Sequence, residues 1–141
     1  PSLPMRCLLL VSLLLVTVSA CASRTVESES VVHDLSPQEV SDVLEAKEER
    51  DLFVLNVHTP YEGELAGTDA FIEDWENIAA HQDVLPLDKS RPLLVYCRSG
   101  RMSSSAVKQL ETLGYETIYH LEGGMRAWND AGLPLINYTA S

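Results

Sequence analysis

A cysteine, two arginines and a glycine are crowded into five positions of this 141-residue sequence, Cys97-Arg98-Ser99-Gly100-Arg101. An apolar run at residues 93–96 precedes the cysteine, and residues 103–113 carry apolar side chains at helical spacing. A strand, a short loop and a helix in that order aim loop N–H groups and the positive end of the helix dipole at the sulfur. Such surroundings favour the nucleophilic thiolate. The alternative is that Cys97 is a buried small hydrophobic residue.

The spacing within this loop separates it from two other kinds of cysteine or histidine site. Phosphate-transferring cysteine enzymes place an arginine after five intervening residues so that it grips the oxyanion. That position is Ser103 here, and Arg101 comes too early. The four histidines and Cys97 show no metal-ligand spacing, so no metal site is predicted. The loop therefore favours a smaller cradle around the sulfur.

The charge and composition of the sequence limit the classes of molecule that it is expected to bind. A formal net charge of −11 disfavours nucleic-acid binding, which needs a basic face. An apolar content of 45% and this length suit one domain with a modest core. Five basic residues fall at or near the proposed loop or near the C-terminus, which predicts a positive mouth that attracts small anions. They are Lys89, Arg91, Arg98, Arg101 and Arg126.

The elements that must position the loop alternate between apolar runs and helix-like segments. This alternation predicts an α/β fold, with a parallel sheet of about five strands and helices on both faces. The strands are expected at residues 31–35, 51–57, 71–72, 93–96 and 117–121. Helices are expected after a capping box at Ser36 and Glu39, and at residues 74–82, 103–113 and 125–131. In such a sheet the site lies at the carboxyl ends of the strands, where both His58 and Cys97 fall.

Three segments of the sequence resemble the rhodanese-like sulfurtransferases. Residues 96–103, Tyr-Cys-Arg-Ser-Gly-Arg-Met-Ser, resemble the active-site loop of that family. Residues 54–62, with Thr-Pro-Tyr-Glu at their end, resemble its early strand, and residues 121–128 resemble its Gly-Gly-x-x-x-Trp segment. The resemblance implies a single rhodanese-like domain at residues 31–138 and a cysteine that carries sulfane sulfur as a persulfide.

The resemblance also implies roles for individual residues. Cys97 would be the catalytic nucleophile, taking sulfur from a thiosulfate-like donor and passing it to a thiol or cyanide acceptor, with no cofactor. His58 stands where the family commonly has arginine, and is a possible auxiliary residue. The alternative function is a non-catalytic binding module or a protein-to-protein sulfur carrier on the same fold. The expected substrate-binding residues are Arg98, Ser99, Gly100, Arg101, Met102 and Ser103. Ser103 is expected to cap the following helix, to hydrogen-bond the sulfur, or both.

The beginning of the sequence predicts export. Met5-Arg6 is followed by a short apolar run, the pattern of a secretory signal. Val18-Ser19-Ala20-Cys21 resembles a bacterial lipoprotein box, which implies a signal at residues 1–21 and lipidation of Cys21. A polar tether at residues 22–30 would then hold the domain on the periplasmic side of a bacterial membrane. Ordinary cleavage, leaving a soluble periplasmic protein, is the alternative.

Overall fold

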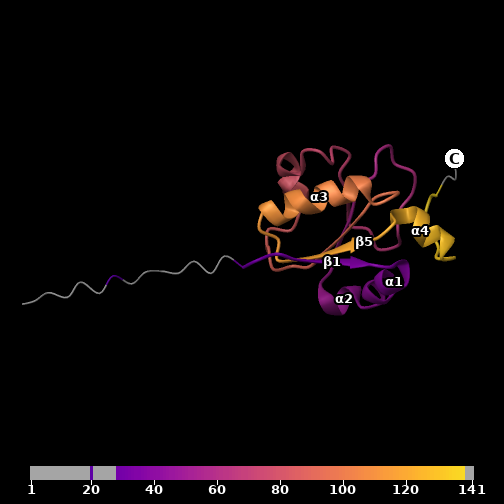
Figure 1. Ribbon diagram of the computed structural model, residues 1–141, viewed down its shortest axis with the longest axis horizontal. Coiled ribbons are helices and arrows are strands. Elements are labelled where there is room, and N and C mark those ends of the chain that lie inside the picture. Colours follow the sequence, from indigo (N-terminus) through magenta and orange to yellow (C-terminus); the bar gives the residue numbers. More distant parts are fainter. Residues whose placement is uncertain (1–19, 21–27, 139–141) are drawn as a thin grey trace, which may run out of the picture.

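A computed structural model describes residue 20 and residues 28–138, and its described part contains a five-stranded parallel sheet (Figure 1). The strand order is β1-β5-β4-β2-β3, which places β4 at the centre. All four pairings are parallel, as predicted for alternating strands and helices. The strands are β1 (Val31–Leu35), β2 (Phe53–Asn56), β3 (Ala70–Phe71), β4 (Leu93–Tyr96) and β5 (Thr117–Leu121).

Helices cover both faces of the sheet (Figure 1). Helix α3 (Arg101–Thr112) and the 3-10 helix η1 (Ile78–Val84) pack on one face. On the other lie α1 (Pro37–Glu45), the short α2 (Lys47–Arg50) and α4 (Gly124–Asp130). Consecutive side chains of β4 alternate between these layers, because a strand directs neighbouring residues to opposite faces. Cys97, directly after β4, therefore belongs to the α3 side.

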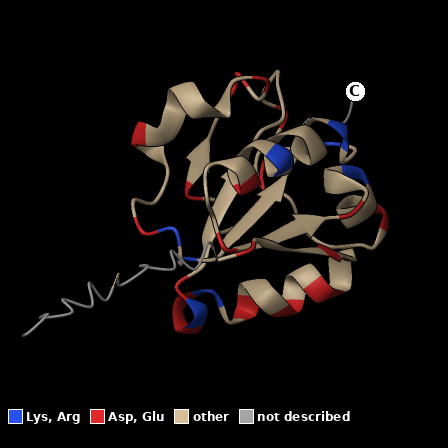
Figure 2. Cartoon of the chain, turned by 60° about the vertical axis from the view of Figure 1, so that its left-hand side comes forward, with Lys and Arg blue, Asp and Glu red and all other residues tan. Residues whose placement is uncertain are grey.

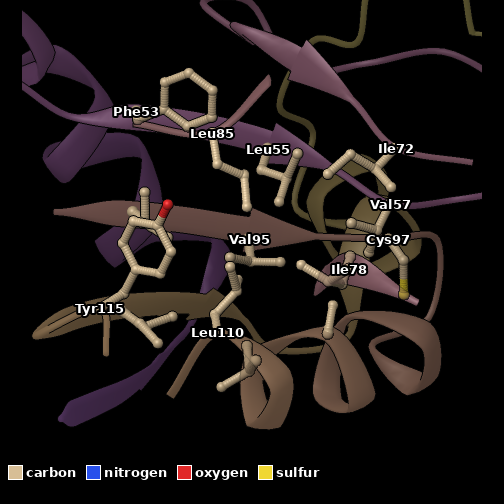
Figure 3. Close-up of a cluster of buried hydrophobic side chains, with 14 residues drawn as sticks. Phe53, Leu55, Val57, Ile72, Ile78, Leu85, Val95, Cys97, Leu110 and Tyr115 are labelled. Carbon is tan, nitrogen blue, oxygen red and sulfur yellow. The ribbon is translucent and has the colours of Figure 1, made fainter. Parts of the chain in front are cut away.

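The core on the α3 side ends at the cysteine. Leu93 and Val95 of β4 pack there with Leu110 of α3, and all three are fully buried. Figure 3 shows the Cys97 sulfur at one end of this cluster, with Tyr115 at the other. The sulfur thus sits where the apolar core gives way to the first turn of α3.

Local sequence signals account for the ends of several elements. The Ser36–Glu39 capping box is present at α1, where the backbone N–H and hydroxyl of Ser36 both donate to the Glu39 carboxylate at 2.8 Å. These bonds, the backbone one first, hold the pKa of Glu39 below its usual range. Gly114, at a φ of +91°, follows the last turn of α3 and ends it as expected.

Two expectations about the elements are wrong. The helix expected at residues 74–82 is instead η1, which begins at Ile78 and is kinked at His81. The predicted positive mouth does not include Lys89 and Arg91, because both precede β4 whereas Cys97 follows it. Lys89 lies 4.0 Å above the Tyr115 ring and Arg91 pairs with Asp51 at 3.3 Å. These two cations therefore lie before the amino end of β4, at the opposite end of that strand from Cys97.

Acidic residues are spread over helices and loops, α1 prominently among them (Figure 2). No helix among the residues that the structure describes is both long and apolar enough to cross a membrane. Apart from residue 20, the predicted signal lies outside the described residues, and so does Cys21. Ser30, placed at the end of the predicted tether, already belongs to the folded part, since its hydroxyl donates to the Tyr115 carbonyl at 2.6 Å.

Candidate active site

The start of α4 donates backbone hydrogen bonds to the loop after β4. The backbone N–H of Met125 donates to the Cys97 carbonyl at 2.9 Å, and that of Arg126 donates to the Arg98 carbonyl at 3.0 Å. Gly124, at a φ of +60°, allows this close approach of two backbones. The Gly-Gly segment therefore supports the cysteine loop.

The sulfur of Cys97 is buried and hydrogen-bonded. Its residue is 1% exposed, and Sγ accepts from the Gly100 N–H at 3.0 Å and from the Ser103 hydroxyl at 3.2 Å. Gly100 has a φ of +98°, a conformation that suits glycine and that turns its N–H toward the sulfur. Two hydrogen-bond donors therefore converge on the Cys97 sulfur, where they would stabilise negative charge that develops during a reaction.

A chain of hydrogen bonds continues from Ser103 to the surface. The Ser103 Oγ lies 2.7 Å from Nε2 of His120, the fourth of the five residues of β5. The other ring nitrogen, Nδ1, lies 2.8 Å from Oδ1 of Asp34, on β1. His120 and Asp34 face each other because β1 and β5 pair in that register. Adjacent strands thereby connect the buried sulfur with an exposed carboxylate.

A second polar cluster surrounds Arg98. Its guanidinium lies 3.3 Å from the Glu62 carboxylate, which also lies 2.8 Å from Nε2 of His58. His58 is 6% exposed, and its Nδ1 has no hydrogen-bond partner among the described residues. The side chain of Asn56 holds the segment from His58 to Gly63 in place. Its amide oxygen accepts from the His58 N–H, and its amide nitrogen donates to the Gly63 carbonyl. The carboxylate of Glu62 therefore links His58 to the cysteine loop.

A pocket of about 340 Å³ opens beside the loop. Gly100 lines it together with the exposed Arg101, the first residue of α3. His120 and Asp34 line the same pocket. The structure thus separates the two arginines that the sequence could not distinguish: Arg98 is paired with Glu62, and Arg101 borders the pocket.

The predicted site residues occupy one stretch, but their local roles differ from expectation in one respect. Helix α3 begins at Arg101, with Gly100 as its N-cap, so Ser103 is inside the first turn and does not cap it. The expected contact of Ser103 with the sulfur is present. Ser99 is exposed on the loop, and Met102 packs against the core.

Sequence reasoning missed three residues of this arrangement: Asp34, Glu62 and His120. The signal that the sequence offers for His120 and Asp34 is their position on expected strands. His120 lies on the strand expected after α3, and Asp34 lies on the first expected strand. Only the order of strands in the sheet places these two beside the loop.

The comparison with known families decides what kind of domain this is. The rhodanese-like domain model matches residues 36–131. This chain belongs to the rhodanese-like domain family. The match covers β2, β4, β5 and the cysteine loop, and the fold agrees with the one that the resemblance implied.

One relative that matches most of this chain carries a sulfurtransferase name. A sulfurtransferase of Allochromatium vinosum is 30% identical over 111 residues, which are 75% of this chain and 96% of that protein. An uncharacterized protein of Synechocystis is 44% identical over 52 residues, but these are 37% of this chain and only 29% of that longer protein.

Solved structures show the same fold. The polysulfide-sulfur transferase of Wolinella succinogenes superposes with a TM-score of 0.60 at 26% identity, over 78% of this chain and 80% of that one. A rhodanese-related protein of Thermoplasma volcanium also gives 0.60, at 24% identity over 74% and 98% of the two chains, and supports the fold.

Proposed function

We propose that this chain is a sulfurtransferase that carries sulfane sulfur as a persulfide on Cys97. The observation that supports the proposal best is the convergence of the Gly100 N–H and the Ser103 hydroxyl on Sγ at the carboxyl end of the central strand. The family and the sulfurtransferase names of its relatives agree with it.

The proposed reaction has two displacement steps. The Cys97 thiolate attacks the outer sulfur of thiosulfate, the S–S bond of the donor breaks, and sulfite leaves with the electron pair. A nucleophilic acceptor then attacks the outer sulfur of the persulfide, and Cys97 departs again as thiolate. A thiol acceptor becomes a persulfide, and cyanide becomes thiocyanate.

Within this proposal the residues in and around the loop have different roles in the reaction. Gly100 and Ser103 stabilise negative charge on Sγ, because donors placed before the reaction need no reorganisation during it. Arg101 draws the anionic donor into the pocket. Arg98, held by Glu62, supports the loop from the other side, and His58 acts through the same carboxylate.

Mass spectrometry of the full chain tests the persulfide directly. Incubation with thiosulfate should add one sulfur atom to the peptide that contains Cys97, and cyanide should remove it as thiocyanate. Cys97→Ser should lose the added sulfur, whereas Cys21→Ser should keep it. Sulfur transfer that survives in Cys97→Ser overturns the proposal. A parallel incubation with polysulfide, prompted by the Wolinella relative, compares the two donor classes.

The same reaction mixture distinguishes the alternative functions. A non-catalytic binding module takes up no sulfur from either donor. A protein-to-protein carrier takes up sulfur and also loses it to cyanide, because cyanide attacks any accessible persulfide, but it turns over slowly with small thiols. Sulfur uptake by the wild-type chain contradicts the binding module, and repeated turnover with a small thiol acceptor contradicts the carrier.

For the N-terminal part we propose a signal at residues 1–21, lipidation of Cys21 and a tether at residues 22–29, one residue shorter than the sequence predicts because Ser30 is bonded to the fold, that places the domain on the periplasmic face of a membrane. The support is the sequence pattern Val18-Ser19-Ala20-Cys21. More than one acyl chain would anchor the protein stably. Intact mass and cell fractionation test this: Cys21→Ser should remove the acyl mass. A soluble wild-type protein without acyl mass contradicts the anchor.

A further inference from the structure

The hydroxyl of Ser103 has three possible hydrogen-bond partners among the described residues but a single hydrogen to donate. They are Sγ of Cys97 at 3.2 Å, the Gly100 carbonyl at 3.2 Å, and Nε2 of His120 at 2.7 Å. The Gly100 carbonyl already accepts from the N–H of Ser104 at 3.0 Å and from its hydroxyl at 2.7 Å. Those two bonds occupy both lone pairs of that oxygen. The Ser103 hydrogen is therefore available to the sulfur or to His120.

Two complete hydrogen-bond arrangements follow from this geometry. In the first, the Cys97 thiol donates to Ser103, the Ser103 hydroxyl donates to Nε2 of a neutral His120, and Nδ1–H donates to Asp34. In the second, Nε2–H of a protonated His120 donates to Ser103, the Ser103 hydroxyl donates to the Cys97 thiolate, and Nδ1–H still donates to Asp34. Every polar hydrogen along the chain has an acceptor in both arrangements.

We propose that His120, oriented by Asp34, takes the proton of the Cys97 thiol through the Ser103 hydroxyl, which makes it a positioning residue and proton partner for the nucleophile. The inference deepens the proposed function, on which it rests. The S–H bond of Cys97 breaks as an O–H bond forms on Ser103, and the original Ser103 proton moves to Nε2. The products are a thiolate and an imidazolium, so charge and protons balance.

The surroundings support this direction of transfer. The Gly100 N–H donates to Sγ in both arrangements, and it binds an anion more strongly than a thiol. The Asp34 carboxylate stabilises the imidazolium, as the carboxylate does in a serine-protease triad. The Asp34 side chain is 66% exposed, which weakens the attraction but lets the relay exchange its proton with water.

Other charged side chains also face His120, and their contribution must be separated from that of the imidazole. Those that line its two pockets come from β1, from α3 and from the residue after β5: Asp34, Arg101, Lys108, Glu111 and Glu122. Replacing the imidazole alone leaves all of these charges in place. His120→Gln is therefore the informative variant, because an amide can still hydrogen-bond Ser103 but cannot accept the proton.

The test is the ultraviolet absorbance of the Cys97 thiolate, followed against pH in the full chain. Subtracting the spectrum of Cys97→Ser removes the contributions of Cys7 and Cys21. In His120→Gln the profile should shift to higher pH by about one unit, which is tenfold, or ~1.4 kcal/mol. Asp34→Asn should shift it in the same direction by less, since the amide oxygen still accepts from Nδ1–H.

His81→Gln is the matched control, because it removes a histidine that pairs with Asp74 at 3.6 Å on η1. Its profile should coincide with that of the wild type. A His120→Gln profile that coincides with the wild type, or an equal shift in His81→Gln, overturns the relay. If His120→Gln does not fold, an unshifted profile in Asp34→Asn overturns it as well. The titration needs no sulfur donor, so a shift without persulfide formation would refute the proposed function and leave the relay standing.

Discussion

Gly124 lies directly against the backbone of Arg98. A β carbon at Gly124 would stand 2.5 Å from the carbonyl carbon of Arg98 and 2.5 Å from the carbonyl oxygen of Cys97. Atoms at that separation overlap, and the obstacle is backbone rather than a movable side chain. The first residue of α4 and the cysteine loop are therefore packed as one unit, although they come from separate segments of the chain.

Replacing Gly124 by alanine should displace the loop. Gly124→Ala is expected to cost about 1–3 kcal/mol more in unfolding free energy than a control without the clash. Gly132→Ala is that control: its φ of +77° carries the same left-handed strain, but no atom of the described residues would lie within 4 Å of the added β carbon. Urea denaturation measures the unfolding free energies of the variants, and the rate of thiosulfate turnover reports whether the cysteine loop is displaced. Equal losses in the two variants would show that contact with Arg98 is unimportant.

Removing the cation at the pocket should weaken donor binding. Arg101→Ala is expected to raise the KM for thiosulfate about tenfold or more, equivalent to at least ~1.4 kcal/mol. Arg101→Lys should restore part of the affinity. Arg91→Ala removes a cation before the amino end of β4, at the opposite end of that strand from Cys97. It should leave the KM for thiosulfate unchanged. Steady-state kinetics of the three variants decides the matter, and an unchanged KM in Arg101→Ala would shift attention to Arg98.

His58 and Glu62 should act as a pair. Because Glu62 contacts both His58 and Arg98, either His58→Gln or Glu62→Gln should loosen the support of the loop. Their effects should not add: the double variant is expected to differ from the sum of the single variants by about 0.5–3 kcal/mol. A double-mutant cycle on kcat/KM and on stability measures this coupling. Strict additivity would mean that His58 acts independently of Glu62.

The hydroxyl of Tyr96 should contribute to stability. It accepts from the backbone N–H of Leu65 at 3.0 Å and shares a 2.7 Å hydrogen bond with Thr68. Tyr96→Phe leaves the buried Leu65 N–H without this acceptor, which should cost about 1–3 kcal/mol. Tyr119→Phe is the control and should be nearly neutral, because the one hydrogen bond of this hydroxyl among the described residues is a 3.4 Å contact with Arg50. Chemical denaturation of both variants provides the comparison.

Tyr96 also predicts how stability responds to alkaline pH. Burial raises the pKa of its hydroxyl above the usual range. Below about pH 10, the ordinary value, both the folded and unfolded chains keep this proton. As the pH rises further, the unfolded chain releases the proton while the folded chain retains it, so stability falls. Tyr96→Phe should lose less stability over this range than the wild type; an identical slope would argue against burial as the cause.

Local signals in the sequence were sufficient for much of the fold. The capping box at Ser36 is a contact between residues three apart, and apolar runs mark buried strands of a parallel sheet. The start of α3 was misplaced by two residues because its N-cap, Gly100, has no side chain to signal a cap. The expected helix at 74–82 failed for a related reason, since the kink at His81 carries no proline or glycine.

The site was predictable only where its residues are neighbours in sequence. Cys97, Gly100 and Ser103 fall within one loop and one helical turn, so their spacing carries the information. His120 and Asp34 are separated by 86 residues and meet only because β1 joins the sheet beside β5. Periodicity predicts both strands but not their adjacency, so the sequence alone supports no role for His120 beyond that of a metal ligand, which its spacing excludes.

The position of β1 has a consequence for how the domain is made. In the described sheet β1, the first strand synthesised, has β5, the last, as its neighbour. Cys97 thus leaves the ribosome before His120 exists and before Asp34 has a strand to pair with. Closing so long a loop is a late and slow event in folding. Under the proposed relay, a chain in which β5 has not yet paired with β1 therefore carries a Cys97 thiol that lacks its proton acceptor.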